Sequence, residues 1–263
     1  MAKRRLKKSV KKILLRIVFT IFIIIGIISV CEIIEFNILK NRTLTPKEEY
    51  EYGYYTMSDF GYVKELSEYD FNLNGNDDYT DILIGLKKVA EENPKYVSDG
   101  YYDGGYPPEG EGVCTDVIWK ALMEAGYKLK DMIVYDIWNT YKDGTYGIDY
   151  IDNNIDFRRV GNQDIFFDRY AKSLTTDYEE LKEFQPGDIV VFNYGEHIAM
   201  ISDRVNVRGV PYLVQNSDEE QIEKEEDVLE ETDMYITSHY RFEYNDTIKQ
   251  LIVDMNKANK EEE

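Results

Sequence analysis

The order in which two kinds of apolar pattern follow one another constrains the fold of this chain more than any other feature. Before residue 187, apolar residues recur at helical spacing, and after it they form short β-type runs separated by turn signals. The helical stretches are 80–94, 114–126 and 129–141, and the β-type runs are 187–193, 197–204, 211–217 and 235–242. Helices followed by strands are typical of an α+β fold, so we expect N-terminal helices packed on an antiparallel sheet. The acidic stretch "DEEQIEKEEDVLEE" predicts a solvated insertion between strands.

The N-terminus combines a basic cluster with a long apolar run. Eight of the first 16 residues are lysine or arginine, and all precede the first acidic residue, Glu32. Residues 17–31 include no charged side chain, and with the apolar residues 13–15 they approach the ~20 residues that span a bilayer. Because a positive flank stays cytoplasmic, we expect one transmembrane helix over 13–33, with the rest of the chain outside the cell membrane.

Two alternatives exist for this N-terminal segment. A cleaved signal peptide needs a small-residue cleavage site, and "IISVCEII" offers no such pattern. A lipid-modified Cys31 needs a small residue before it, and Val30 stands there instead. We therefore predict an uncleaved anchor and five segments along the chain. They are a cytoplasmic basic segment (1–12), the transmembrane anchor (13–33), an extracytoplasmic tether (34–69) with a short helix at 45–52, a folded domain (70–245) and a C-terminal tail (246–263).

The uneven charge of the chain limits the class of partner. The net charge is −20, and because eight basic residues lie within the first 16, everything after them carries −28. Such a surface repels backbone phosphates, which excludes nucleic acid. It can attract cationic diamino-acid groups or calcium, or keep the domain soluble, and the sequence does not choose among these.

Three side chains can form a nucleophilic centre. Cys114 opens the helix in "GVCTDVIWKALMEAGY", and a helix N-terminus lowers the pKa of a cysteine and offers N–H groups to an oxyanion. His197 opens a β-type run after a turn and can act as the base, while Gln215 on the next run can orient the imidazole. On a regular strand Asn216 points to the opposite face from Gln215. The alternative is a buried structural cysteine and a hydrogen-bonded structural histidine.

The segment "DFNLNGNDDYTD" has the spacing of a calcium-binding loop. Oxygen-bearing side chains stand at positions one, three and five, a glycine at six and an acid at twelve. The candidate ligands of a structural calcium ion are Asp70, Asn72, Asn74, Asp78 and Asp81. Asp77 stands where an apolar residue is usual, and an aspartate replaces the final glutamate. The alternative is an Asx-rich turn that caps a helix at Thr80.

Six separated blocks of this sequence resemble the motifs of one bacterial family, in the same order. They are "GVCTDVIWKALMEAGY", "NIDFRRVGNQDIFF", "FQPGDIVVF", "HIAMISDR", "PYLVQNS" and "SHYRF". The family is called domain of unknown function 1287, and it resembles the NlpC-type cell-wall peptidases, which have a papain-like fold. The resemblance covers roughly residues 75–243.

The resemblance implies a role for several residues of this chain. Cys114 matches the nucleophile, His197 the general base, and Gln215 the third polar position, where relatives often have histidine. Asp116, Arg158 and Arg159 are candidate substrate-binding residues: the arginines can bind a carboxylate bidentately. The alternatives are helix-start electrostatics for Asp116 and pairing with the chain's own carboxylates for the arginines. We expect a structural role for His239.

The function implied by the resemblance is a membrane-anchored cysteine amidase or endopeptidase. Its substrate is an amide bond in peptidoglycan stem peptides or cross-links, and catalysis requires no cofactor. The alternative is a non-catalytic module that binds cell-wall peptide or a partner on the same fold. Acyl transfer onto a lipid or amine acceptor is a third, weaker option.

Overall fold

The computed structural model describes residues 55–230 and 234–261. The predicted anchor at 13–33 and the short helix predicted at 45–52 lie outside these residues. Within the described part of the chain, no helix combines the length and the apolar composition needed to cross a bilayer. The described residues form an α+β structure, as the order of patterns predicts.

Five α-helices and four short 3-10 helices lie within the described residues. The α-helices are α3 (Asp78–Glu92), α4 (Cys114–Glu124), α5 (Leu129–Thr140), α6 (Val160–Tyr170) and α7 (Asp246–Glu261). The 3-10 helices are η1 (Met57–Phe60), η2 (Tyr141–Asp143), η3 (Asp156–Arg158) and η4 (Tyr178–Glu183). The Asp77 side chain caps α3 by accepting the N–H of Thr80. The helix ends at Glu92, and the next residue, Asn93, is left-handed and precedes Pro94.

One antiparallel sheet carries the second half of the domain. Its strands run in the order β4-β9-β5-β6-β7-β8, and β1 pairs with the far end of β6. The strands are β1 (Tyr55–Thr56), β4 (Lys172–Ser173), β5 (Ile189–Phe192), β6 (His197–Val205), β7 (Pro211–Val214), β8 (Glu225–Glu226) and β9 (Ile236–Arg241). A separate parallel pair joins β2 (Lys95–Tyr96) to β3 (Glu111–Gly112), just before α4.

Both faces of the sheet are buried. On β5, Ile189 and Val191 join the core shared with the helices, whereas Val190 and Phe192 join a second core on the other face. Side chains alternate along a strand, so a strand covered on both sides must be apolar at every position. The continuous run "IVVF" of β5 meets that requirement.

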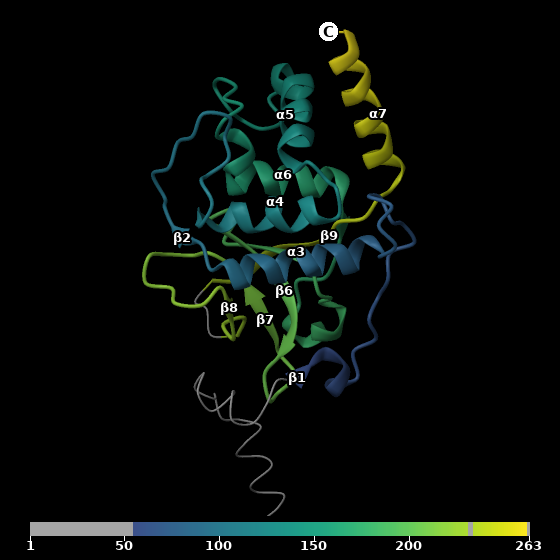
Figure 1. Cartoon of the computed structure of the whole chain (residues 1–263), viewed down its shortest axis with the longest axis vertical. Coiled ribbons are helices and arrows are strands. Elements are labelled where there is room, and N and C mark those ends of the chain that lie inside the picture. The colour runs from purple at the N-terminus through teal and green to yellow at the C-terminus, as the bar shows by residue number, and fades with distance from the viewer. Residues whose placement is uncertain (1–54, 231–233, 262–263) are drawn as a thin grey trace, which may run out of the picture. The chain divides into compact units, whose positions relative to one another are not determined.

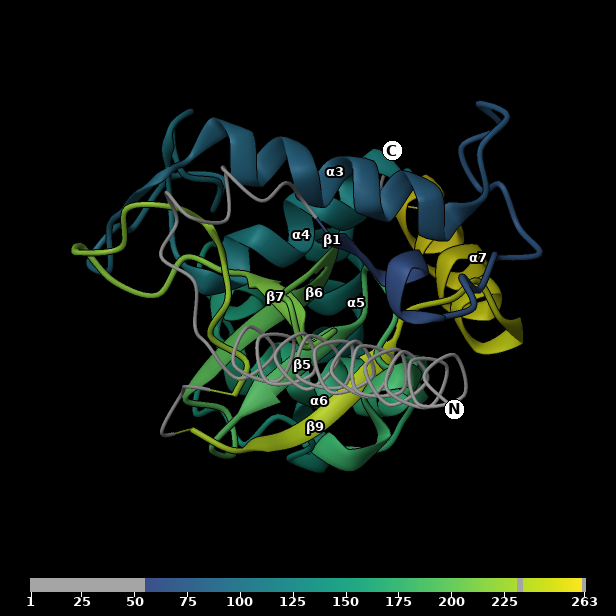
Figure 2. The same cartoon turned by 90° about the horizontal axis from the view of Figure 1, so that it is seen from below.

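Helix α4 is the central helix of the domain. It packs against α3, α5 and β6, and it lies between α3 and the pair α5 and α6 in Figure 1. A Cβ atom at Gly85 of α3 would lie 2.6 Å from the Ala121 carbonyl oxygen of α4, so glycine is what permits this close approach. Figure 2 also places α3 beside α4. The packing holds the start of α4 against the sheet.

Three segment predictions need correction. The C-terminal tail predicted at 246–263 forms α7 instead, because Ile248 and Leu251 occur at helical spacing and are buried beside α5. The tether predicted at 34–69 is part of the domain from residue 55, where β1 pairs with β6 and Met57 is buried. The acidic insertion is not fully solvated, since it supplies β8 and the buried Leu229.

Candidate active site

The turn before α4 places Cys114 at the first position of the helix. Val113 is extended, and its N–H donates to the Asp116 carboxylate at 2.8 Å. The indole N–H of Trp119 donates to the same carboxylate at 2.7 Å. Asp116 thus closes the first turn from within, and its own N–H donates to the Val113 carbonyl at 3.0 Å.

Cys114 is a free, partly exposed cysteine whose sulfur contacts β6. The backbone N–H of Ile198, the residue after His197, donates to the sulfur, as does the N–H of Thr115. Burial nevertheless raises the pKa of the thiol to about 11. The expectation that the helix start lowers this pKa is therefore wrong for the unliganded protein, because loss of solvation outweighs these hydrogen bonds.

His197 begins β6 directly after the turn at 193–196 and pairs with Phe192 across the hairpin. Its Nε2 atom lies 2.8 Å from Gln215 Oε1, in a hydrogen bond between two buried side chains. Burial lowers the pKa of His197, and the bond to Gln215 and the charge of Asp218 oppose this only in part. The imidazole is therefore neutral at pH 7, and Nδ1 is the ring nitrogen left for the thiol.

Asn216 points away from Gln215, as the alternation of a strand predicts. Its Nδ2 atom donates to the Gly112 carbonyl at 3.0 Å and to the Pro94 carbonyl at 3.3 Å. Gly112 lies two residues before Cys114. Consecutive residues at the end of β7 thus hold both parts of the candidate centre: Gln215 holds the histidine, and Asn216 holds the loop that carries the cysteine.

The candidate substrate-binding residues are paired with each other or with neighbours. Arg158 donates from Nε and Nη2 to both oxygens of Asp116, at 2.9 and 2.7 Å, and from Nη1 to the Gly100 carbonyl at 3.0 Å. Both side chains of this pair are at most 3% exposed. Arg159 pairs with Asp156 at 3.4 Å. Both arginines therefore pair with carboxylates of the chain itself, as the alternative interpretation predicts. The Asp116–Arg158 pair positions the turn that carries Cys114.

Gln163, which the sequence did not predict as a site residue, supports the same turn. This fully buried residue of α6 donates from Nε2 to the Thr115 carbonyl at 3.2 Å and to the Phe157 carbonyl at 2.9 Å. Thr115 in turn donates from Oγ1 to the Arg158 carbonyl at 2.9 Å. The block "NIDFRRVGNQDIFF" could have indicated this residue, because it places a polar residue between apolar ones on a helix.

The proposed calcium loop forms a network of turns around Asp81. Asn72 and Asn74 donate side-chain N–H groups to Asp81 Oδ2 at 2.8 and 2.9 Å, and Asp70 accepts the N–H of Asn74 at 3.1 Å. Asp78 accepts the Phe71 N–H at 2.8 Å and the Tyr127 hydroxyl at 2.6 Å, so both of its oxygens have protein partners, and its role as a ligand stays a prediction.

The loop therefore matches the Asx-rich alternative, with Asp77 as the capping residue of α3. No group of three or more histidine, cysteine, aspartate or glutamate side chains within 55–230 and 234–261 is arranged to hold a metal ion. Calcium binding stays a prediction. Calorimetric titration of the full-length protein tests it, because an absence of heat at millimolar calcium rules the site out.

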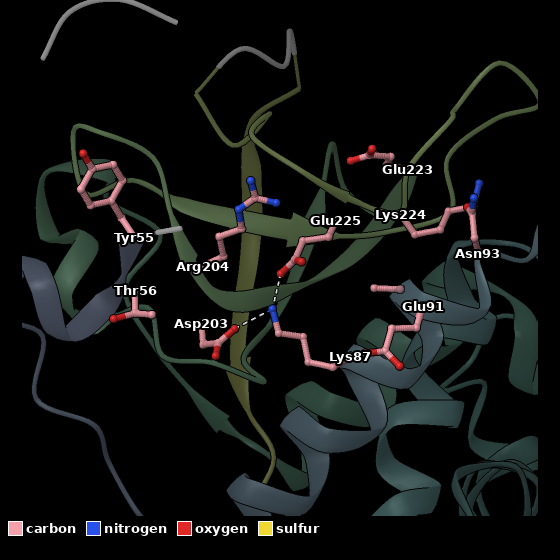
Figure 3. A pocket seen from close by; sticks show the side chains of 11 residues that line it. Tyr55, Thr56, Lys87, Glu91, Asn93, Asp203, Arg204, Glu223, Lys224 and Glu225 are labelled. Carbon is pink, nitrogen blue, oxygen red and sulfur yellow. Dashed lines mark hydrogen bonds and ion pairs between the residues drawn. The ribbon is translucent and has the colours of Figure 1, made fainter. Parts of the chain in front are cut away.

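A cavity of about 540 Å³ lies between α3, β6 and β8 (Figure 3). Lys87 enters it from α3 and pairs with Asp203 at 2.6 Å and with Glu225. Those carboxylates raise the pKa of Lys87 despite its burial, so the ammonium stays charged and cannot act as a base. The ion pairs of Lys87 across this cavity hold α3 to the sheet.

Comparison with known proteins agrees with the resemblance in the motifs. The family model described as Domain of unknown function (DUF1287) matches residues 85–242, which include Cys114, His197 and Gln215. The Uncharacterized protein YijF of Escherichia coli (strain K12) is 32% identical over 155 residues, covering 57% of this chain and 73% of YijF. No solved structure matches. The chain belongs to the family described as Domain of unknown function (DUF1287).

Proposed function

We propose that this protein is a membrane-anchored, extracytoplasmic cysteine amidase or endopeptidase that acts on an amide bond in peptidoglycan peptides. One observation carries the proposal. The 2.8 Å bond from His197 Nε2 to Gln215 leaves Nδ1 as the free ring nitrogen, and the Cys114 sulfur contacts the backbone of the very next residue, Ile198. A candidate nucleophile, base and orienting group thus come from neighbouring residues, which supports the arrangement that covalent catalysis needs.

In the proposed mechanism the resting site is uncharged. His197 Nδ1 takes the thiol proton as the sulfur of Cys114 attacks the amide carbonyl, and a C–S bond forms. The oxyanion is stabilised by the backbone N–H groups at the start of α4. Nδ1–H then protonates the leaving amine as the C–N bond breaks. Water, deprotonated by the same nitrogen, hydrolyses the thioester to a carboxylic acid and restores the thiol.

We also propose a papain-like arrangement for the domain. A cysteine at the start of a helix packed on an antiparallel sheet, with the base at the start of one strand and the polar group after the next, supports it. The acidic charge after residue 16 suits a substrate with a free amine, as in a diamino acid. The anchor at 13–33 would keep the domain beside the cell wall.

Incubation with purified muropeptides tests the proposal. The full-length protein in mild detergent should release a peptide or free amine product that mass spectrometry identifies by the added mass of water. Cys114→Ser is the matched control, since it keeps size and polarity while weakening the nucleophile. An equal product yield from that variant, or no product from the native protein with either stem peptides or cross-linked dimers, contradicts the proposal.

A second candidate function is a binding module without turnover. The pKa of about 11 for Cys114 favours it, because the unliganded protein holds almost no thiolate at pH 7. A cysteine-directed acyl probe separates the two functions. Rapid labelling of Cys114 that disappears in His197→Ala supports the enzyme, whereas labelling as slow as that of a free thiol in both proteins supports the module.

A further inference from the structure

The side-chain amide of Gln215 connects His197 to a carboxylate on the neighbouring strand. Its Oε1 atom lies 2.8 Å from His197 Nε2, and its Nε2 atom donates to Glu226 Oε2 at 3.2 Å. An amide has one donor end and one acceptor end, whereas an ionised carboxylate only accepts. The end of Gln215 that faces Glu226 must therefore be the NH₂ group, which leaves the carbonyl oxygen for the histidine.

This orientation decides which ring nitrogen of His197 carries the proton. A carbonyl oxygen only accepts, so His197 must donate from Nε2–H, and the neutral ring then holds its lone pair on Nδ1. We propose that Glu226 is a positioning residue that, through Gln215, fixes His197 in the tautomer able to accept the Cys114 proton. The inference rests on the proposed function of that site and adds a fourth residue to it.

Glu226 is held in place by its own contacts. Gln221 donates from Nε2 to Glu226 Oε2 at 2.7 Å and to the Gln215 backbone carbonyl at 3.3 Å. Strand β8 pairs Glu226 with Leu213 of β7. The residue before it, Glu225, pairs with Lys87 of α3, as Figure 3 shows. The two neighbouring glutamates thus have different tasks: Glu225 fastens β8 to α3, and Glu226 orients Gln215.

Two other charged side chains lie near this connection. The buried Lys224 places its Nζ 3.4 Å from Gln221 Oε1, and the charges of Glu226 and Asp218 both act on it. Burial lowers the pKa of Lys224, which these two carboxylates oppose. The Glu226 carboxylate thus accepts hydrogen bonds from Gln215 and Gln221 beside a buried cation.

A cavity of about 520 Å³ leads from the surface to the contact between Gln215 and Glu226, so a small molecule can reach it. Gln215, Gln221 and Glu226 all line it. Truncation of Glu226 to alanine would therefore open space for a small carboxylate such as formate, which can accept the Gln215 NH₂ group in place of the missing side chain.

The direct readout is the tautomer of His197 in the full-length, isotope-labelled protein, by nitrogen NMR. The native protein should show the Nε2–H tautomer. Glu226→Lys places a donor opposite Gln215, which should turn the amide round and shift the tautomer ratio toward Nδ1–H by about tenfold or more. Glu226→Gln can still accept and should keep the native tautomer, and formate should restore it in Glu226→Ala. Glu225→Gln, on the opposite side of β8, is the matched control.

An unchanged tautomer in both folded Glu226→Lys and Glu226→Ala overturns the inference, and so does a change of the same size in Glu225→Gln. If Glu226→Lys does not fold, the formate dependence of Glu226→Ala decides. This test needs no turnover, so it separates the inference from the proposed function. Absence of muropeptide cleavage by the native protein removes the hydrolase but leaves the tautomer result standing, while cleavage with an unchanged tautomer removes only the role of Glu226.

Discussion

The two histidines of this chain lie in the same sheet but have different hydrogen-bond partners. His197 on β6 and His239 on β9 are both buried, and both use Nε2 in a hydrogen bond. His239 bonds a carboxylate, Asp188, and uses Nδ1 as well, on the Thr175 carbonyl at 2.6 Å. His197 bonds a neutral amide, which leaves Nδ1 for the thiol. Burial therefore does not distinguish the two histidines, whereas the number of engaged ring nitrogens does, and only His197 keeps a nitrogen for the proposed role as a base.

The surroundings of the two rings differ in charge as well. Asp188 accepts hydrogen bonds from both His239 and Arg241, at 2.7–3.0 Å, and Phe184 stacks on the His239 ring with centroids 4.2 Å apart. That cluster ties β5 to β9, and its contacts agree with the structural role expected for His239. The centre at His197 has a weaker, uncharged orienting bond. Such a bond suits the proposed base, which would gain and lose a proton during the proposed reaction.

The largest expected effect is on chemistry. His197→Ala should reduce muropeptide hydrolysis by about 100- to 10,000-fold, because it removes the general base. His239→Asn, measured in the same assay at a temperature where it is folded, should keep the native rate within a few-fold. If both variants are folded by circular dichroism and lose hydrolysis to a similar extent, the two histidines do not differ in the way proposed.

The second effect is on stability, and here the larger loss is expected at the His239 cluster rather than at the His197 site. Asp188→Ala leaves His239 and Arg241 buried without their shared carboxylate and should lower the free energy of unfolding by about 3–5 kcal/mol. Gln215→Ala removes a neutral hydrogen bond and should cost about 1–2 kcal/mol. Urea unfolding of both variants beside the native protein measures the two values, and equal losses contradict the comparison.

The third prediction concerns the pH dependence of alkylation at Cys114. Only the thiolate reacts, and the pKa of Cys114 is about 11, so the rate constant should rise about tenfold per pH unit from pH 7 to pH 10. A thiolate already paired with a charged His197 would give a flat profile over this range. Iodoacetamide labelling of the unliganded protein, followed by mass spectrometry at Cys114, distinguishes these profiles.

The smallest effect is the contribution of His197 to stability at acidic pH. Its pKa in the folded state is lowered, so below about pH 6.5 the unfolded state binds more protons. This contribution is fully present above that pH and is lost as the pH falls. His197→Gln should therefore lose less stability than the native protein between pH 7 and pH 5. Cys114→Ser retains both histidines and should follow the native curve in the same urea titration.

Much of the fold could be predicted from periodicity. The predicted helices at 80–94 and 129–141 and the strands around 187–193 and 197–204 agree with the structure within a few residues, because burial on one or both faces imposes the pattern. The helix α7 was missed because its few apolar residues are diluted by charge, and only the contact with α5 makes them a buried face. Strand β8 was missed since a two-residue, glutamate-only strand has no periodicity.

Some features of the candidate site could likewise be predicted from the sequence, and others could not. The sequence by itself determined that Cys114 starts a helix and that Gln215 and Asn216 point to opposite sides, because both follow from local backbone geometry. Tertiary structure alone decided the pKa of the thiol, the partners of Arg158 and the link from Glu226 to His197. Solvation and hydrogen-bond partners depend on groups distant along the chain: Arg158 lies 42 residues from Asp116, and no local pattern records such pairings.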